Sequence, residues 1–92
     1  MIETIRHKGL EAFYRADERK GLPQKLVKRL ATILAALDVA EGPQDVALPG
    51  LRLHPLKGDL AGYWSVSVSG NWRLVFRFHN KAVYDLDLVD YH

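Results

Sequence analysis

Cysteine is absent from the 92 residues, so neither disulfide bonds nor a cysteine-based zinc site can stabilise the fold. Long apolar runs are absent as well. The stretch ILAAL at residues 33–37 is far shorter than the roughly 20 residues needed to cross a bilayer, and Glu3 interrupts any signal-like start. We therefore expect a cytoplasmic protein that makes no membrane contact and whose stability comes from an apolar core.

The signature motifs of several enzyme classes are also missing. The chain has no P-loop, no GxGxxG and no GxSxG motif, so nothing supports nucleotide-cofactor binding or α/β-hydrolase chemistry. The four histidines and the scattered acids show none of the spacings that zinc sites use. We expect no metal site.

The formal net charge of +2 conceals an uneven distribution along the chain. Residues 1–81 contain all 13 Lys and Arg residues, whereas the last 11 residues contain three acids and no Lys or Arg. A basic body favours a polyanionic partner such as nucleic acid, although ordinary domains show the same balance. With 48% apolar residues, the chain has the size and composition of one domain spanning residues 1–92.

Apolar residues with helical spacing dominate the first half of the chain. Those at positions 26, 30, 33, 34 and 37 share one face of a helix predicted from Leu22 to Leu37, with Pro23 in its first turn. A segment from about Lys8 to Arg19 repeats this period, and the two would form a helical hairpin. Residues 41–50, EGPQDVALPG, are predicted to be a loop. Residues 1–6 are a candidate edge strand.

After this loop the apolar period changes from 3.6 to 2, which is typical of strands with one apolar face. Three strands are predicted near residues 63–69, 72–79 and 84–88, separated by the turn sequences SGN and HNK. Residues 51–54 are a further candidate strand. Helices followed by an antiparallel meander indicate an α+β fold with the helices packed on the apolar face. That face is expected to carry Trp64, Val66, Leu74, Phe76, Tyr84, Leu86 and Leu88.

Polar residues alternate with the apolar ones on the other face of this sheet. For Arg77, a cross-strand ion pair with Asp85 or Asp87 is the simplest interpretation. Arg73 lies near the start of its strand and away from most of these acids. An unpaired guanidinium there could bind a phosphate through two parallel hydrogen bonds.

Several residue types that metal-free RNA cleavage requires occur in LHPLKGD (residues 53–59) and in the final DYH. Attack of a 2′-hydroxyl on the adjacent phosphate needs a base, an acid for the leaving oxygen and cations for the charged phosphorane. Histidine titrates near neutrality, and lysine and arginine stabilise developing charge. His54 and Lys57 could equally be ordinary loop residues, and DYH could be a solvated end. Composition alone does not show that these residues converge.

The stretch LHPLKGDLAGYWSVSVSGNWRLVFRF, followed by the final DYH, resembles the HigB toxins of bacterial toxin–antitoxin pairs, which belong to the RelE-like superfamily of small ribonucleases. The resemblance begins at KGLEAF, from Lys8, and continues to His92. It implies a compact RelE-like fold with two N-terminal helices packed on an antiparallel sheet. It also implies an endoribonuclease that enters the ribosomal A site, cuts the messenger RNA there and so inhibits translation.

The same resemblance implies that no metal or organic cofactor is used. It implies neutralisation by a HigA antitoxin with a helix-turn-helix domain, in a complex that represses its own operon, so that operator DNA is contacted only through the antitoxin complex. Carried over residue by residue, the catalytic positions of the family are His54, Lys57, Arg73, Asp90, Tyr91 and His92. His92 and Asp90 would share proton transfer, without a decision on which is the base.

The other four positions have complementary roles under this resemblance. Lys57 and Arg73 would hold the scissile phosphate, Tyr91 would position the nucleotide, and His54 would share acid–base work or orient a neighbour. The helical half is less diagnostic. Its basic cluster, Lys20, Lys25, Lys28 and Arg29, either contacts ribosomal RNA or is a solvated helix face. Two rival classes remain: a non-catalytic RNA-binding or regulatory module of the same fold, and an interaction protein.

Overall fold

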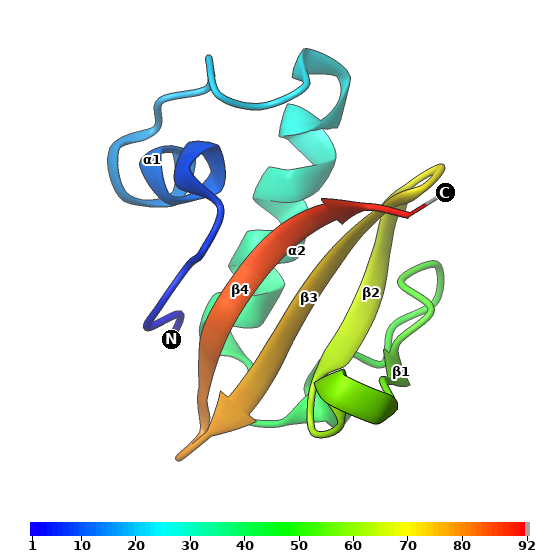
Figure 1. Cartoon of the computed structure of the whole chain (residues 1–92). Helices are drawn as coiled ribbons and strands as arrows, with labels where there is room; N and C mark the ends of the chain where they lie inside the picture. Colours follow the sequence, from blue (N-terminus) through cyan, green and yellow to red (C-terminus); the bar gives the residue numbers. More distant parts are fainter. Residues whose placement is uncertain (92) are drawn as a thin grey trace.

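The computed structural model describes residues 1–91, which form a four-stranded antiparallel sheet accompanied by two α-helices (Figure 1). The sheet order follows the chain, β1-β2-β3-β4, and α2 crosses behind the sheet in Figure 1. The elements are α1 (Lys8–Ala16), α2 (Val27–Val39), β1 (His54–Pro55), β2 (Trp64–Ser69), β3 (Trp72–His79) and β4 (Ala82–Asp90), with 3₁₀ turns η1 (Gln24–Leu26), η2 (Pro43–Val46) and η3 (Gly58–Leu60). The predicted α+β class, helices before an antiparallel sheet, is confirmed.

The core lies between α2 and the sheet. Leu30, Ile33 and Leu37 of α2 are fully buried, as their spacing predicts. The sheet supplies Val66, Leu74, Phe76 and Leu86, which are also fully buried. Each such side chain stabilises the fold by about 1.5–3 kcal/mol relative to exposure. Within residues 1–91, neither helix combines the length and apolarity that crossing a bilayer requires.

Both helices differ from the predicted bounds at their ends. α1 stops at Ala16 because Asp17 adopts a left-handed backbone (φ 56°), and its N–H donates to the carbonyl oxygens of Ala12 and Phe13. α2 is preceded by η1, so that Pro23 lies before the 3₁₀ turn and not in the first turn of the α-helix. Apolar residues with helical spacing continue past the end of α1 and occur before the start of α2. The predicted helices therefore extend beyond the observed ones at these two points.

Gly9 of α1 packs directly on the backbone of the helix connection. A Cβ at Gly9 would lie 2.2 Å from the carbonyl oxygen of Gly21, and a Cβ at Gly21 would lie 2.8 Å from the Cα of Gly9. Neither position tolerates a side chain without a backbone shift. Two glycines that are separated in sequence therefore set how closely the connection approaches α1.

The N-terminal segment extends the sheet beyond β4. Ile2 and Ile5 form parallel bridges with Val83 and Leu86, and hydrogen bonds such as Glu3 N–H to the Val83 carbonyl oxygen (2.8 Å) join the two segments. The expected edge strand is thus present as bridges alongside β4. At the other edge, the strand predicted at residues 51–54 is displaced to β1, His54–Pro55, which pairs with β2.

A β-bulge in β4 changes which residues face the core. The pairing of β3 with β4 shifts between Val75 and Arg77, and Asp85 of the bulge has φ 56°. Leu86 faces the core as predicted, but Tyr84 is the Cα partner of Arg77 on the opposite face. Val83 is fully buried in its place. The prediction for Tyr84 is wrong because strict alternation fails when one residue is inserted.

Candidate active site

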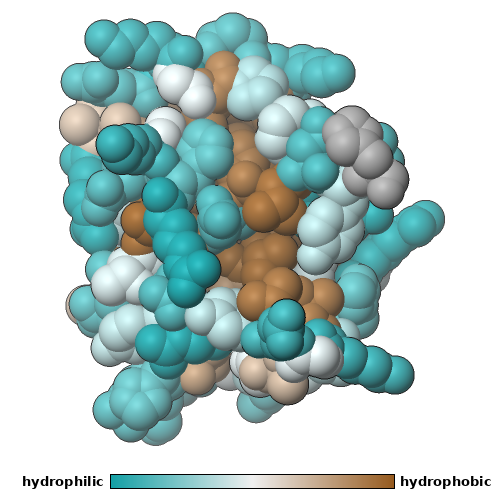
Figure 2. All heavy atoms as spheres, in the orientation of Figure 1, coloured by the Kyte–Doolittle hydropathy of each residue, from teal (hydrophilic) through white to brown (hydrophobic). Residues whose placement is uncertain are grey.

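The face of the sheet opposite α2, here called the outer face, carries two of the predicted catalytic residues, His54 and Arg73. Directly paired residues share a face, so the register defines rows of side chains across the strands. Figure 2 views this face and shows hydrophobic side chains along its middle with hydrophilic ones on both sides. Two rows cross it: Ser67, Arg73 and Val89, and next to them His54, Ser65, Val75 and Asp87.

Arg73 lies on β3 close to the turn that joins β2 to β3. Its Nη1 donates to the carbonyl oxygens of Gly70 (2.9 Å) and Trp72 (3.1 Å) and to Oγ of Ser67 (3.3 Å). Among residues 1–91 it forms no ion pair, in contrast to Arg77 on the same strand. The turn therefore orients one side of the guanidinium fork, while its charge is not neutralised by a described acid. The binding of a phosphate by this guanidinium stays a prediction.

Asp90 and Tyr91 follow at the end of β4. Asp90 is the Cα partner of Trp72, whose side chain packs on the core, so the register places Asp90 on the helix side of the sheet. Tyr91 is 44% exposed, and its N–H donates to the carbonyl oxygen of Asn71 (2.8 Å). Asp90 and Arg73 therefore start from opposite faces. Both lie at the end of the sheet that carries the β2–β3 turn.

His54 and Lys57 lie at the other edge of the sheet. His54 is exposed on β1 opposite Ser65, and its Nδ1 lies 3.3 Å from the carbonyl oxygen of Pro55. Lys57 is exposed at the start of η3. Arg73 belongs to the row next to that of His54 and lies two strands away, so the register places both on the outer face. His92, which carries the predicted proton-transfer role, lies outside the described residues.

A family model described as the RelE-like toxin of the type II toxin–antitoxin system HigB matches residues 3–92. The chain belongs to this HigB family of RelE-like toxins. It is 40% identical over 92 residues to an endoribonuclease HigB of Proteus vulgaris, with 100% of both chains covered. It is also 36% identical over 80 residues to the toxin HigB-1 of Vibrio cholerae, covering 85% of this chain and 84% of that protein. The family resemblance inferred from the sequence is confirmed.

Solved structures of related toxins share the fold of this HigB-family toxin. The toxin in a YoeB–YefM complex from Staphylococcus aureus superposes with a TM-score of 0.64 at 19% identity, covering 100% of this chain and 98% of that one. A YoeB/ParE toxin from Agrobacterium tumefaciens gives a TM-score of 0.57 at 22% identity, covering 100% and 99%. Both likenesses support the architecture of two helices and an antiparallel sheet.

Residues of the basic cluster in the helical half of the toxin have different neighbours. Lys28 lines a groove between α1 and α2 together with Arg19, and Arg29 Nη2 donates to the carbonyl oxygen of Gly50 (3.4 Å). Lys25, on η1, instead lines a pocket with Asp90 at the rim of the sheet. Sequence reasoning missed this second environment because nothing local links η1 to the end of β4.

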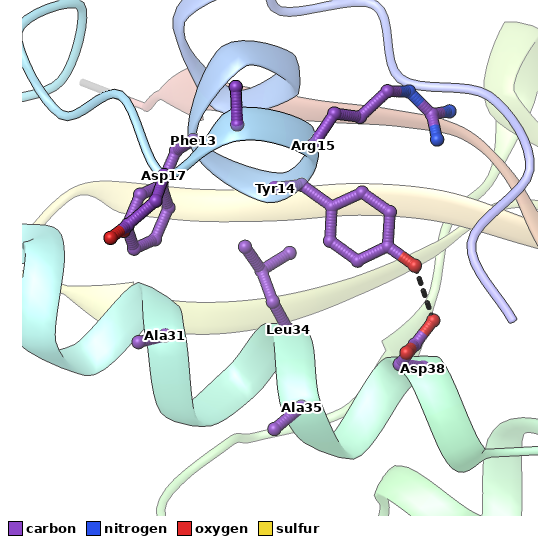
Figure 3. A pocket seen from close by; sticks show the side chains of 9 residues that line it. Phe13, Tyr14, Arg15, Asp17, Ala31, Leu34, Ala35 and Asp38 are labelled. Atoms are coloured by element: carbon purple, nitrogen blue, oxygen red, sulfur yellow. Dashed lines mark hydrogen bonds between the residues drawn. The ribbon is translucent and has the colours of Figure 1, made fainter.

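A second groove of about 430 Å³ lies between α1 and α2 of the toxin (Figure 3). Phe13 and Leu34 form its apolar floor, and the Tyr14 hydroxyl donates to Oδ1 of Asp38 (2.5 Å) across the two helices. Burial raises the pKa of Tyr14, and the hydrogen bond to Asp38 raises it further. Asp38 also accepts from the N–H of Ile2, so this contact joins both helices to the N-terminal segment. We assign it a structural role.

The predicted ion pair of Arg77 is confirmed, with Asp85 as its partner. Nε of Arg77 lies 2.8 Å from Oδ2 of Asp85, and the Tyr63 hydroxyl donates to the same oxygen at 3.0 Å. The backbone N–H of Asp85 donates to the Thr4 hydroxyl (2.7 Å). The Arg77 hydrogen bond, followed by that from Tyr63, holds the pKa of Asp85 below its usual range against an opposing effect of burial. This network secures the bulge in β4.

Asp85→Asn should therefore make the toxin less stable at neutral pH, by roughly 1 kcal/mol or less. Asparagine tolerates the left-handed backbone, so the change mainly removes charge. Because the folded-state pKa of Asp85 is depressed, its contribution is present above the unfolded value of about 3.9 and is lost as pH falls through the folded value. Chemical denaturation at pH 7 and near pH 3 should show the variant and the wild type converging in acid. An equal difference at both pH values, or the same result for the exposed Asp59→Asn, would contradict this.

Among residues 1–91, no three His, Asp or Glu side chains are grouped so that they could hold a metal ion. The side chains available for chemistry in the described part of the candidate site are an imidazole, an ammonium, a guanidinium, a carboxylate and a phenol. These can transfer protons, hold a phosphate and stabilise developing negative charge.

Proposed function

We propose that this toxin is a ribosome-dependent endoribonuclease that cuts messenger RNA in the ribosomal A site and thereby inhibits translation. Full-length identity of 40% to an endoribonuclease HigB supports the enzyme class. The observation that carries the proposal is Arg73, which the β2–β3 turn orients on the outer face without a described acidic partner. A guanidinium that is held in place and has no described acidic partner can bind a phosphate of the RNA backbone through two hydrogen bonds.

The proposed reaction is attack of a 2′-hydroxyl on its adjacent phosphate, which breaks the bond to the 5′-oxygen of the next nucleotide. Arg73 and Lys57 hold the phosphate and stabilise the charge that develops on it. Asp90 and His92 share proton transfer, taking the 2′-hydroxyl proton and supplying one to the leaving oxygen. Tyr91 positions the nucleotide, and His54 shares acid–base work or orients a neighbour. The RNA would cross the rim of the sheet, where groups from both faces can reach it.

The shape of the site supports dependence on the ribosome. His54, Lys57 and Tyr91 are exposed, and the pocket beside Asp90 has a volume of about 290 Å³, at the low end of small-ligand pockets. A pocket of this size matches about one nucleotide of a strand. A ribosome that presents the message in a fixed conformation would align the strand, since orientation contributes a large part of catalysis.

The partners follow from the family and from the proposed reaction. A type II toxin requires an antitoxin, and we propose a HigA-type antitoxin with a helix-turn-helix domain that brings the complex to operator DNA. The location would then be the cytoplasm, where ribosomes and messages are found. We propose that the basic cluster contacts ribosomal RNA through the charges of Lys20, Lys25, Lys28 and Arg29. A non-catalytic RNA-binding module of the same fold is the alternative function.

Mapping the 5′ ends of messenger RNA on ribosomes after a short pulse of toxin expression tests the proposal. We expect new ends within the codon occupied by the A site, and their absence after a pulse of the Asp90→Asn variant. New ends spread over ribosome-free RNA would contradict ribosome dependence. Growth arrest without any new ends would favour the non-catalytic alternative.

A further inference from the structure

Lys25 lines a pocket at the rim of the sheet together with Asp90 of the candidate active site. Lys25 comes from η1, in the connection between the two helices, whereas Asp90 ends β4. The β2–β3 turn, residues 69–71, and Trp72 line the same pocket. These groups line one cavity of about 290 Å³. Lys25 and Asp90 share this cavity only because of the fold, since the two residues are far apart in the sequence.

The chemistry of the lining suits a nucleotide. An ammonium group offers three donors and a positive charge for a phosphate. An indole offers a flat surface for a base, and stacking of this kind contributes about 1–3 kcal/mol per base. Trp72 is half-buried, so its ring is anchored on the core while part of it is accessible. The lining is thus polar and aromatic, in contrast to the apolar groove between the helices.

The positive charge of Lys25 also opposes an electrostatic repulsion that the substrate would meet in the proposed reaction. Asp90 is a carboxylate, and any RNA phosphate that comes close to it is repelled. Lys25 shares the pocket with Asp90 and carries the opposite charge. It can offset this repulsion when the substrate enters, without taking part in proton transfer.

We propose that this pocket is a subsite for one nucleotide of the substrate RNA, in which Lys25 binds a backbone phosphate next to the cleaved one and Trp72 supports the base. The inference rests on the proposed endoribonuclease function. It moves Lys25 from the ribosome-binding cluster to the substrate site, and leaves Lys20, Lys28 and Arg29 as the proposed ribosome contacts. Lys25 is then a substrate-binding residue that acts beside the proton-transfer groups.

The test separates binding of the ribosome from cleavage of the message. Lys25→Ala, Lys25→Arg and, as a control of equal charge change, Lys81→Ala are compared with the wild type. Lys81 lies in the turn between β3 and β4, at the opposite end of the sheet. Single-turnover cleavage of ribosome-bound message is measured at saturating ribosome, and ribosome affinity is measured separately by sedimentation. Thermal melts confirm that each variant is folded.

We expect Lys25→Ala to lower the saturated cleavage rate about 10- to 100-fold, the effect of losing a hydrogen bond to a charged group, with ribosome affinity nearly unchanged. Lys25→Arg should restore most of the rate, and Lys81→Ala should match the wild type. Loss of ribosome affinity with an unchanged saturated rate would overturn the subsite and return Lys25 to the ribosome contacts. An unchanged rate and affinity would overturn it as well. A wild-type toxin that does not cut ribosome-bound message would overturn both this inference and the proposed function.

Discussion

Arg73→Ala should lower cleavage of ribosome-bound message by about 10²–10³-fold, the usual cost of removing one preorganised donor from a developing negative charge. The guanidinium is oriented by the carbonyl oxygens of Gly70 and Trp72 and by the hydroxyl of Ser67. No described acid neutralises it, so its charge is available to a phosphate. The single-turnover rate at saturating ribosome is the measurement. Because the variant also loses three hydrogen bonds to the β2–β3 region, a thermal melt serves as the control that it is folded.

Arg77→Ala is a matched control for this prediction. It lies on the same strand and the same face as Arg73, but its charge is engaged by Asp85 at 2.8 Å. We expect this variant to lose stability and to retain most of its cleavage activity. Arg73→Lys should be intermediate, because it keeps the charge and loses the planar fork. Equal loss of activity at both arginines would mean that the outer face acts through its overall charge and that Arg73 has no special role.

Asp90→Asn should lower the saturated cleavage rate by about 10²–10⁴-fold, the range for removing a general acid or base. Asparagine preserves the size of the side chain and the backbone pairing with Trp72, but it cannot accept a proton. The register and the rim pocket place Asp90 where RNA crossing the end of the sheet can reach it. Ribosome affinity should be retained, so the loss should appear in the rate at saturation.

Asp87→Asn is the corresponding control. Asp87 is on the same strand, but it pairs with Val75 in the middle of the outer face and does not line the rim pocket. We expect near wild-type cleavage from it. A fully active Asp90→Asn variant would remove Asp90 from proton transfer and leave that role to the histidines. A parallel loss in both aspartate variants would instead indicate a general effect of negative charge on β4.

Periodicity was sufficient to predict most of the core. The spacing of Leu30, Ile33 and Leu37 identified the buried face of α2, and alternation identified Val66 and Leu74 in the sheet. These predictions succeed because burial follows directly from helix and strand geometry. Element ends were predicted less well. α1 ends at Ala16 because Asp17 has a left-handed backbone conformation. The spacing of apolar residues does not predict the backbone angle of one residue.

The sheet register shows where local pattern stops being informative. Alternation placed Tyr84 in the core, and the bulge at Asp85 moves it to the outer face beside Arg77. The bulge depends on hydrogen bonds that Asp85 makes with Thr4 and Tyr63, from segments distant in sequence. A rule based on neighbours along the chain cannot contain that information.

The sequence by itself determined the fold class, the helical and strand faces and the family, because apolar period and the motifs LHPLKGD and DYH are local properties of the chain. It also supplied the residue types that RNA cleavage requires. Only the tertiary structure decided how they are arranged: Arg73 on the outer face, Asp90 at the rim, and Lys25 in the same pocket as Asp90. The physical reason is that such contacts arise when η1, the β2–β3 turn and β4 pack together, and no spacing along the chain encodes that packing.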